Sequence, residues 1–186
     1  KDNWSRTALA WMSIGYETQV PPMNTLAFYN AIANNGVMVK PKFVKAEMVN
    51  GQIVREFPTE VLIEQICKPS TLKDIQFCLN NVVSIGLGRT AGNGGKLFQV
   101  SGKTGTAQNP HGNDHSVFIC FAPKDDPKIA VAAYVENGGF GATWAAPIAS
   151  LLTEKYLNGE ISESRKPLEE RMLQGYLLDR VKVKKK

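Results

Sequence analysis

Three apolar runs in the second half of the chain place the strongest constraint on its fold. They cover residues 97–107, 116–122 and 128–135, and they are rich in β-branched, aromatic and small apolar side chains. The segment Pro-Lys-Asp-Asp-Pro at residues 123–127, between the second and third runs, has a turn composition. The sequence therefore predicts a meander of three antiparallel strands as the core sheet.

Three segments with a helical spacing of apolar residues surround these runs, at residues 23–34, 70–83 and 144–156. Two prolines precede the first, Ser70 is placed to cap the second, and Asn158-Gly159 ends the third. We expect the third helix to cover one face of the sheet. The faces expected to pack are Leu26, Tyr29, Asn30 and Ala33 in the first helix, Leu72, Ile75, Gln76 and Leu79 in the second, and Ile148, Leu151, Leu152 and Lys155 in the third.

Two further segments connect these elements. Residues 37–57 predict a peripheral β-hairpin, because short β-branched runs flank Asn50-Gly51, and Asn-Gly is a strong two-residue hairpin signal. The glycine-rich residues 86–95 predict a mobile connection into the first strand of the sheet.

The segment Ser-Gly-Lys-Thr-Gly-Thr-Ala-Gln at residues 101–108 continues the first strand with small polar residues. Side chains alternate along a strand, so Thr104 and Thr106 fall on one face while Lys103 and Gly105 point the other way. Glycines on both sides of Lys103-Thr104 let a ligand or another backbone approach closely. The threonine face could hold a carboxylate or a carbonyl group.

Three interpretations of this segment compete. A phosphate-binding loop fails, because its first glycine would fall at position 97, which is Leu97. A glycine-containing core strand without chemistry is the plainest alternative. The third is the K-T-G element of serine acyl-transferases that react with penicillin, whose other signatures are S-x-x-K and S-D-N.

The wider sequence favours the third interpretation. After residues 101–108 come Asp114-His115, then Phe-Ala-Pro at 121–123, then Val-Glu-Asn-Gly-Gly at 135–139. In this order they resemble the C-terminal part of the transpeptidase domain of class B penicillin-binding proteins, most closely the elongation-type branch, penicillin-binding protein 2. The upstream segments 13–16 and 31–36 also resemble this family, although Tyr16-Glu17 departs from its usual turn and residues 15–17 are instead similar to some division-type members.

The resemblance implies an α/β (α+β) fold, an α/β/α sandwich with an antiparallel sheet of the serine β-lactamase and transpeptidase type, incomplete in this chain. It also implies a D,D-transpeptidase that cross-links peptidoglycan stem peptides through a serine acyl-enzyme and binds β-lactams. Lys103, the lysine of the catalytic K-T-G motif, would supply positive potential along the substrate edge. The Thr104 and Thr106 hydroxyls would bind a terminal carboxylate. The Thr106 backbone would contribute to an oxyanion hole, with Gly105 and Ala107 along the substrate edge.

The sequence departs from the family pattern in one respect. It contains no S-x-N triplet, and its one S-x-x-K is Ser70 to Lys73, which we interpret as a helix cap followed by a solvent-facing lysine. The nucleophile is then missing. We expect a fragment, with residues 1–159 as the C-terminal part of the domain and residues 160–186 as a charged tail. By itself the fragment should be inactive.

Two other function classes stay open. One is a non-catalytic module that binds a partner among the cell-wall synthesis proteins. The other is a serine β-lactamase or D,D-carboxypeptidase relative that shares K-T-G. The Thr-Ala-Gln continuation at residues 106–108 and the Glu-Asn-Gly-Gly block weigh against both.

Composition excludes several other classes. The formal charge of +5 lies partly in the lysines at residues 182–186, and no interleaved aromatic residues support nucleic-acid binding. No apolar run approaches about 18 residues, so we expect any membrane anchor outside this chain, with the parent protein in the bacterial inner membrane and this domain in the periplasm. The cysteines at 67, 78 and 120 are expected to be buried thiols, and neither a metal nor another cofactor is expected, because His111, Asp114 and His115 lack a further ligand motif.

Overall fold

A computed structural model describes residues 5–92 and 99–177 of the chain. Its helices are α1 (Ala8–Met12), α2 (Pro22–Ala33), α3 (Pro69–Ser84), α4 (Arg89–Gly92), α5 (Ala145–Asn158), the 3-10 turn η2 (Glu163–Arg165) and α6 (Lys166–Leu173). Its strands are β1 (Met38–Val39), β2 (Ala46–Val49), β3 (Gln52–Glu56), β4 (Val61–Ile63), β5 (Ser101–Ala107), β6 (His115–Ala122) and β7 (Ile129–Val135).

The predicted meander is confirmed. The strands β5, β6 and β7 form one antiparallel sheet in that order, with Ser101 opposite Phe121 at one end of the first pair and Ala107 opposite His115 at the other. The second pair runs from Ser116 opposite Val135 to Ala122 opposite Ile129. Of the residues expected in the first strand, 97 and 98 lie outside the described part of the chain.

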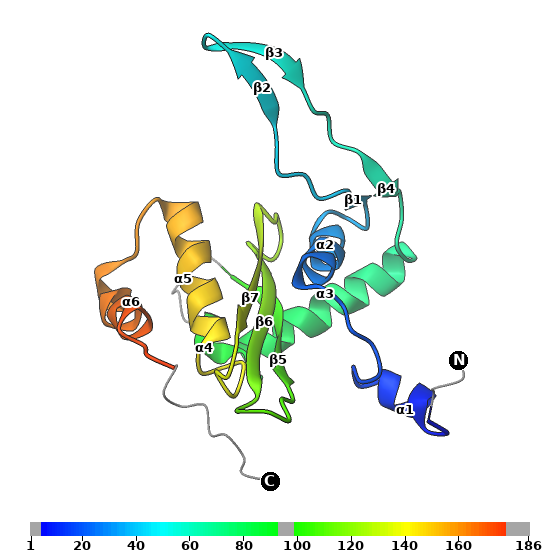
Figure 1. Cartoon of the computed structure of the whole chain (residues 1–186), viewed down its shortest axis with the longest axis vertical. Coiled ribbons are helices and arrows are strands. Elements are labelled where there is room, and N and C mark those ends of the chain that lie inside the picture. Colours follow the sequence, from blue (N-terminus) through cyan, green and yellow to red (C-terminus); the bar gives the residue numbers. More distant parts are fainter. Residues whose placement is uncertain (1–4, 93–98, 178–186) are drawn as a thin grey trace.

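Helices cover both faces of this sheet, which confirms the α/β/α sandwich (Figure 1). Successive β6 side chains alternate between the faces. Phe118 and Cys120 belong to a buried cluster with α5, whereas Phe121 packs with Ile32 of α2 and Leu79 of α3. The middle strand is therefore buried on both sides, and apolar burial of this kind is the dominant favourable contribution to folding.

The second helix was placed correctly, but its cap was not. Leu72 and Leu79 of the expected face are buried, yet α3 begins at Pro69 with Lys68 as its N-cap residue, and no side chain caps it by hydrogen bonding. Ser70 therefore lies inside the first turn. The physical reason is that proline fits the first helical position, where its fixed φ is helical and a missing N–H costs nothing.

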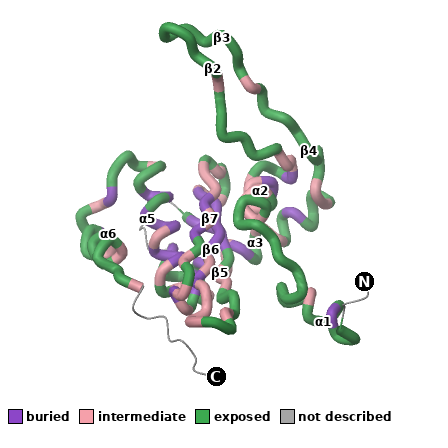
Figure 2. The backbone as a smooth tube through the Cα atoms, viewed as in Figure 1, coloured by how far each residue is buried: buried purple, intermediate pink, exposed green. Residues whose placement is uncertain are grey.

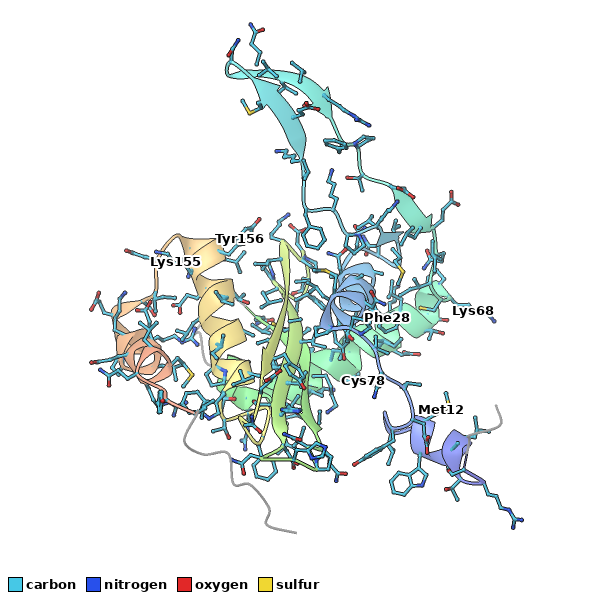
Figure 3. The ribbon with its side chains drawn as sticks, in the orientation of Figure 1. Met12, Phe28, Lys68, Cys78, Lys155 and Tyr156 are labelled. Carbon is cyan, nitrogen blue, oxygen red and sulfur yellow. The ribbon has the colours of Figure 1, made fainter. Side chains whose placement is uncertain are left out.

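The expected packing face of α5 is wrong in part. Leu151 is buried, but Leu152 is 53% exposed and Lys155 is exposed too. The other buried residues of α5 are small or polar, namely Ala145, Ala146, Pro147, Ala149, Ser150, Thr153 and Glu154. Small side chains let the helix approach the sheet closely. The buried Glu154 carboxylate pairs with Arg165, which follows α5 in the chain. Figure 3 labels Lys155 and Tyr156, both exposed, near the end of this helix.

Glu154 and Arg165 form a buried ion pair that attaches the residues after α5. The Arg165 Nη1 atom lies 2.7 Å from Glu154 Oε2, and Nη2 donates to Ser150 Oγ at 2.6 Å. The Ser162 hydroxyl donates to the other Glu154 oxygen at 2.7 Å, and Ser150 donates to the Ala91 carbonyl at 2.7 Å. Residues 161–165 thus pack on α5, while the domain boundary after residue 159 stays a prediction.

The hairpin predicted for residues 37–57 is present around its turn as β2 and β3, whereas Met38 and Val39 form β1, which pairs with β4 instead. Asn50 and Gly51 both have positive φ, 51° and 79°, which is the type I′ turn that matches strand twist. Strands β2 and β3 pair only with each other among the described residues, and they project away from the body (Figures 1 and 2). Apart from the half-buried Ala46, every residue of the two strands is exposed.

Two smaller expectations differ from the structure. A short helix, α4, occupies part of the glycine-rich connection, and the Thr90 hydroxyl donates to the Ala142 carbonyl at 3.2 Å. Residues 93–95 of that connection lie outside the described part.

The cysteines are all free thiols, but only Cys120 is buried, while Cys67 is half-buried and Cys78 is exposed on α3. Within the described residues, no helix is both long and apolar enough to span a bilayer.

Candidate functional site

The Lys-Thr-Gly segment lies on β5, at one edge of the three-stranded sheet. The strand is buried at Ser101 and Gly102 and becomes accessible from Lys103 onward. Lys103 is exposed, and its Nζ donates to the Thr104 carbonyl at 2.7 Å. A Cβ on Gly102 would lie 2.5 Å from the Ile119 carbonyl oxygen, so no other residue fits there without movement. The site therefore begins where the strand leaves the core.

The two threonines share the face of the sheet that α5 covers. Thr104 is directly opposite Phe118, and Thr106 is directly opposite Ser116. Phe118 belongs to the cluster with α5, and the Ser116 hydroxyl donates to the Phe140 carbonyl at 2.9 Å. Lys103 and Gly105 lie on the other face, opposite Ile119 and Val117. The sharing of a face by Thr104 and Thr106, predicted from strand alternation, is confirmed.

Two loops at the end of β5 are held together by polar contacts. Asn109 Nδ2 donates to Asn137 Oδ1 at 3.0 Å, and the Asn137 N–H donates to His115 Nδ1 at 3.1 Å. The Asn109 N–H donates to Asp114 Oδ1 at 3.3 Å. The Gly139 N–H donates to the Asp114 carbonyl at 2.7 Å. The loop before β6 and the turn after β7 therefore form one polar rim.

A cavity of about 300 Å³ opens beside this rim. Thr106 lines it from β5, Asp114 and Asn137 from the rim, and Phe140 and Trp144 from the segment that leads into α5. Thr106 therefore belongs both to the exposed edge strand and to the wall of the cavity. Ser116 supports this wall, because its Oγ also accepts a hydrogen bond from the Ala145 N–H at 3.1 Å.

Of the predicted residues, the structure places Ala107 opposite His115 and brings Thr106 and Asp114 to one cavity. Sequence reasoning did not single out Asn109, Ser116, Phe140 or Trp144 as site residues. Phe140 and Trp144 follow the Glu-Asn-Gly-Gly turn directly, so an aromatic pair next to a glycine turn was the available signal. Asn109 had no signal, because its role depends on a contact with Asn137, 28 residues away.

The one S-x-x-K pair of the sequence does not lie on the edge strand that carries Lys103. Ser70 and Lys73 are both exposed, and Ser70 lies in the first turn of α3 rather than on the sheet edge. No group of three or more His, Cys, Asp or Glu side chains in residues 5–92 and 99–177 is arranged to hold a metal ion. What the site offers is an edge strand with a cation, two hydroxyls and exposed backbone groups.

Comparison with known proteins gives a consistent result. The family model described as the penicillin binding protein transpeptidase domain matches residues 1–154. Stage V sporulation protein D of Bacillus subtilis is 35% identical over 151 residues, which is 75% of this chain and 23% of that protein. Peptidoglycan D,D-transpeptidase MrdA of Haemophilus influenzae is 30% identical over 171 residues, which is 82% of this chain and 26% of that protein.

Solved structures show the same similarity. The ceftriaxone acyl-enzyme complex of penicillin-binding protein A from Mycobacterium tuberculosis matches 78% of this chain and 34% of its own, with a TM-score of 0.70 and 26% identity. The D,D-transpeptidase domain of a peptidoglycan glycosyltransferase from Eggerthella lenta matches 76% of this chain and 33% of its own, with a TM-score of 0.65 and 30% identity. The chain spans about a quarter to a third of the length of these proteins.

Proposed function

Because the chain belongs to the penicillin-binding protein transpeptidase domain family, we propose that it forms one wall of the active site of a peptidoglycan D,D-transpeptidase. The observation that carries this proposal is the position of Lys103, Thr104 and Thr106 on an exposed edge strand. An edge strand can pair with an extended peptide through its backbone, and its side chains can then bind the end of that peptide.

The proposed roles follow from the chemistry of acyl transfer. A serine supplied by another part of the parent protein attacks the peptide carbonyl, and a neighbouring lysine accepts its proton. Lys103 provides positive potential at the edge, and the Thr104 and Thr106 hydroxyls bind a terminal carboxylate. The Thr106 N–H helps to stabilise the oxyanion, and Gly105 and Ala107 leave room for the substrate backbone.

The same edge is proposed to receive β-lactams. Several similar structures are acyl-enzyme complexes of penicillin-binding protein A from Mycobacterium tuberculosis with ceftriaxone, imipenem or penicillin G. A β-lactam presents a reactive carbonyl and a carboxylate, the two groups that the edge strand is proposed to bind. The parent protein would then act at the outer side of the bacterial inner membrane.

Acylation by a fluorescent penicillin, measured by intact mass, tests this proposal. We expect a longer protein that includes the upstream S-x-x-K region to gain the mass of one penicillin. Replacement of Lys103 by Ala in that protein should slow acylation by about 10²-fold or more, a loss typical of removing an electrostatic group from a catalytic site.

The 186-residue chain is the control, and it should stay unlabelled. Labelling of this chain at Ser70 would contradict the assignment of the nucleophile to another part of the protein. An unchanged acylation rate after Lys103→Ala would contradict the role of the edge strand.

A further inference from the structure

The chain contains five Asn-Gly pairs, a dipeptide that can rearrange without an enzyme because glycine leaves its backbone nitrogen unhindered. The glycine nitrogen attacks Cγ of the asparagine side chain, a C–N bond forms, and the side-chain amide leaves as ammonia. One water molecule then opens the resulting cyclic imide to aspartate or isoaspartate. Four pairs lie in the described residues, at 35–36, 50–51, 137–138 and 158–159, and the fifth, at 93–94, lies outside them.

In three of the four described pairs, the attacking nitrogen already donates a hydrogen bond. Each of these glycine N–H groups donates to a carbonyl earlier in the chain: Gly36 to Ala31 at 2.8 Å, Gly138 to Val135 at 3.2 Å, and Gly159 to Lys155 at 3.0 Å. The nitrogen must lose its proton to attack, so a hydrogen-bonded N–H reacts only when the segment opens, as in amide hydrogen exchange.

The surroundings restrain these three pairs further. Gly36 and Gly138 are buried, and the Asn137 side chain accepts a hydrogen bond from Asn109 Nδ2 at 3.0 Å. Asn158 and Gly159 are exposed, but the hydrogen bond of Gly159 ends α5, a helix with eight buried residues. Opening any of these segments therefore disrupts packed or hydrogen-bonded structure.

The pair Asn50-Gly51 differs from the other three. Both residues are exposed at the tip of the projecting ribbon of β2 and β3 (Figure 2). The strand residues next to the turn, Val49 and Gln52, pair with each other, and the Gly51 N–H donates no hydrogen bond to any part of the chain that the structure describes. The attacking nitrogen is therefore accessible to solvent without any opening.

Closure of the imide also requires the tip to leave its turn conformation, and the ribbon opposes this weakly. Within the described residues, β2 and β3 pair only with each other, and all of their residues except the half-buried Ala46 are exposed. A two-stranded ribbon without further packing is marginally stable in water. Its tip therefore opens at a lower cost than the packed segments that hold the other three pairs.

We propose that Asn50 is a site of spontaneous deamidation, and that it is the first of the four described Asn-Gly pairs to be modified in the folded protein. Either product places a carboxylate at the tip of the ribbon, and isoaspartate also adds a methylene group to the main chain. A two-residue turn with positive φ at both positions cannot keep its geometry with an extra main-chain atom. The isoaspartate form should therefore lose the neighbouring strand pairs, Val49 with Gln52 and Met48 with Ile53.

This inference does not depend on the proposed function. The test incubates the folded 186-residue chain at pH 8 in water labelled with oxygen-18, which marks residues deamidated before digestion, and follows the Asn-Gly peptides by mass spectrometry. We expect Asn50 to react about ten-fold faster or more than Asn35, Asn137 and Asn158, because only its glycine nitrogen reacts without the loss of a hydrogen bond.

The same chain unfolded in urea is the control. All four asparagines are followed by glycine, so their rates should become similar once the folded hydrogen bonds are lost. A second control is Asn50→Gly, which removes the reactive amide but keeps a type I′ turn sequence. NMR should show the contacts between Met48 and Ile53 disappearing as isoaspartate forms in the unchanged chain, and persisting in Asn50→Gly.

Three results would overturn the inference. Equal rates for Asn50 and Asn158 in the folded chain would show that exposure, rather than a free N–H, sets the rate. An unmodified Asn50 in the folded chain, beside reaction in urea, would show that the turn protects its own amide. Strand pairs that persist after isoaspartate has formed would contradict the expected effect on the ribbon.

Discussion

The three cysteines show how strongly reactivity depends on the surroundings of a single residue. Cys120 is buried between the sheet and α5, and burial raises the pKa of its thiol to about 12. Cys78 is exposed on the outer side of α3 (Figure 3). The thiolate is the reactive form, so burial protects Cys120 both by excluding reagents and by disfavouring ionisation.

We predict that iodoacetamide at pH 8 modifies Cys78 first and Cys120 only after unfolding. With a pKa of about 12, only about 10⁻⁴ of the Cys120 thiol is ionised at that pH. Peptide mass spectrometry over time would measure both rates, and similar rates for the two residues would contradict the prediction. Because the pKa is raised in the folded state, the stability that the neutral Cys120 thiol contributes should be complete below about pH 9 and should fall as the pH rises toward 12.

Gly102 permits a close approach between β5 and β6 that a side chain would prevent. A Cβ at this position would lie 2.5 Å from the Ile119 carbonyl oxygen and 2.7 Å from Cys120 Cβ. We predict that Gly102→Ala lowers the free energy of unfolding by about 1–3 kcal/mol, measured by urea denaturation. Gly105→Ala is the matched control, because its nearest neighbour would be Val117 Cβ at 3.3 Å, and it should cost less. Equal losses would show that backbone freedom, rather than contact, sets the cost.

At the scale of elements, the Glu154–Arg165 pair joins three segments. Glu154 is 0% exposed on α5, and its partner Arg165 belongs to η2. Ser150 accepts a hydrogen bond from Arg165 and donates one to the Ala91 carbonyl of α4. Since α4 lies between α3 and β5 in the chain, the pair also stabilises the segment that precedes the edge strand.

We predict that Glu154→Ala lowers the free energy of unfolding by about 3–5 kcal/mol, because it removes the carboxylate that neutralises the buried Arg165 charge. The double variant Glu154→Leu with Arg165→Met should lose less than the sum of the single changes. Lys40→Ala, which removes an exposed ion pair with Glu60, is the control and should change stability by less than about 1 kcal/mol. Additive losses in the double variant would contradict a direct coupling.

At the scale of the molecule, the hairpin and the sandwich are separate structural units. Among the described residues, the hairpin strands make no extensive contact with any helix, and their residues are almost entirely exposed. The sandwich, in contrast, buries both faces of β6.

We therefore predict that removal of the hairpin leaves the sandwich intact. The Phe57 N–H donates to the Lys45 carbonyl at 3.0 Å, so an Asn-Gly turn can join these residues in place of 46–56. The melting temperature should change by less than about 4 °C, the shift that a change of 1 kcal/mol produces in a domain of this size. A much larger decrease would show that the hairpin stabilises the body.

The sequence by itself determined the elements whose signals are local. The order of the strands, the Asn50-Gly51 turn and the shared face of Thr104 and Thr106 all follow from chain periodicity and turn chemistry, which need no distant contact. The Lys-Thr-Gly segment also indicated where the first strand becomes accessible, because its small polar residues interrupt an apolar pattern.

Tertiary structure decided what depends on distant partners. The buried side of α5 holds Glu154 rather than Leu152, because Arg165 compensates the cost of burying a carboxylate. Lys68 replaces Ser70 as the cap because a proline occupies the first helical position. The rim and its cavity depend on the contact of Asn109 with Asn137, which no local pattern encodes. Local periodicity reports which residues favour burial, but only the folded chain shows which polar groups meet.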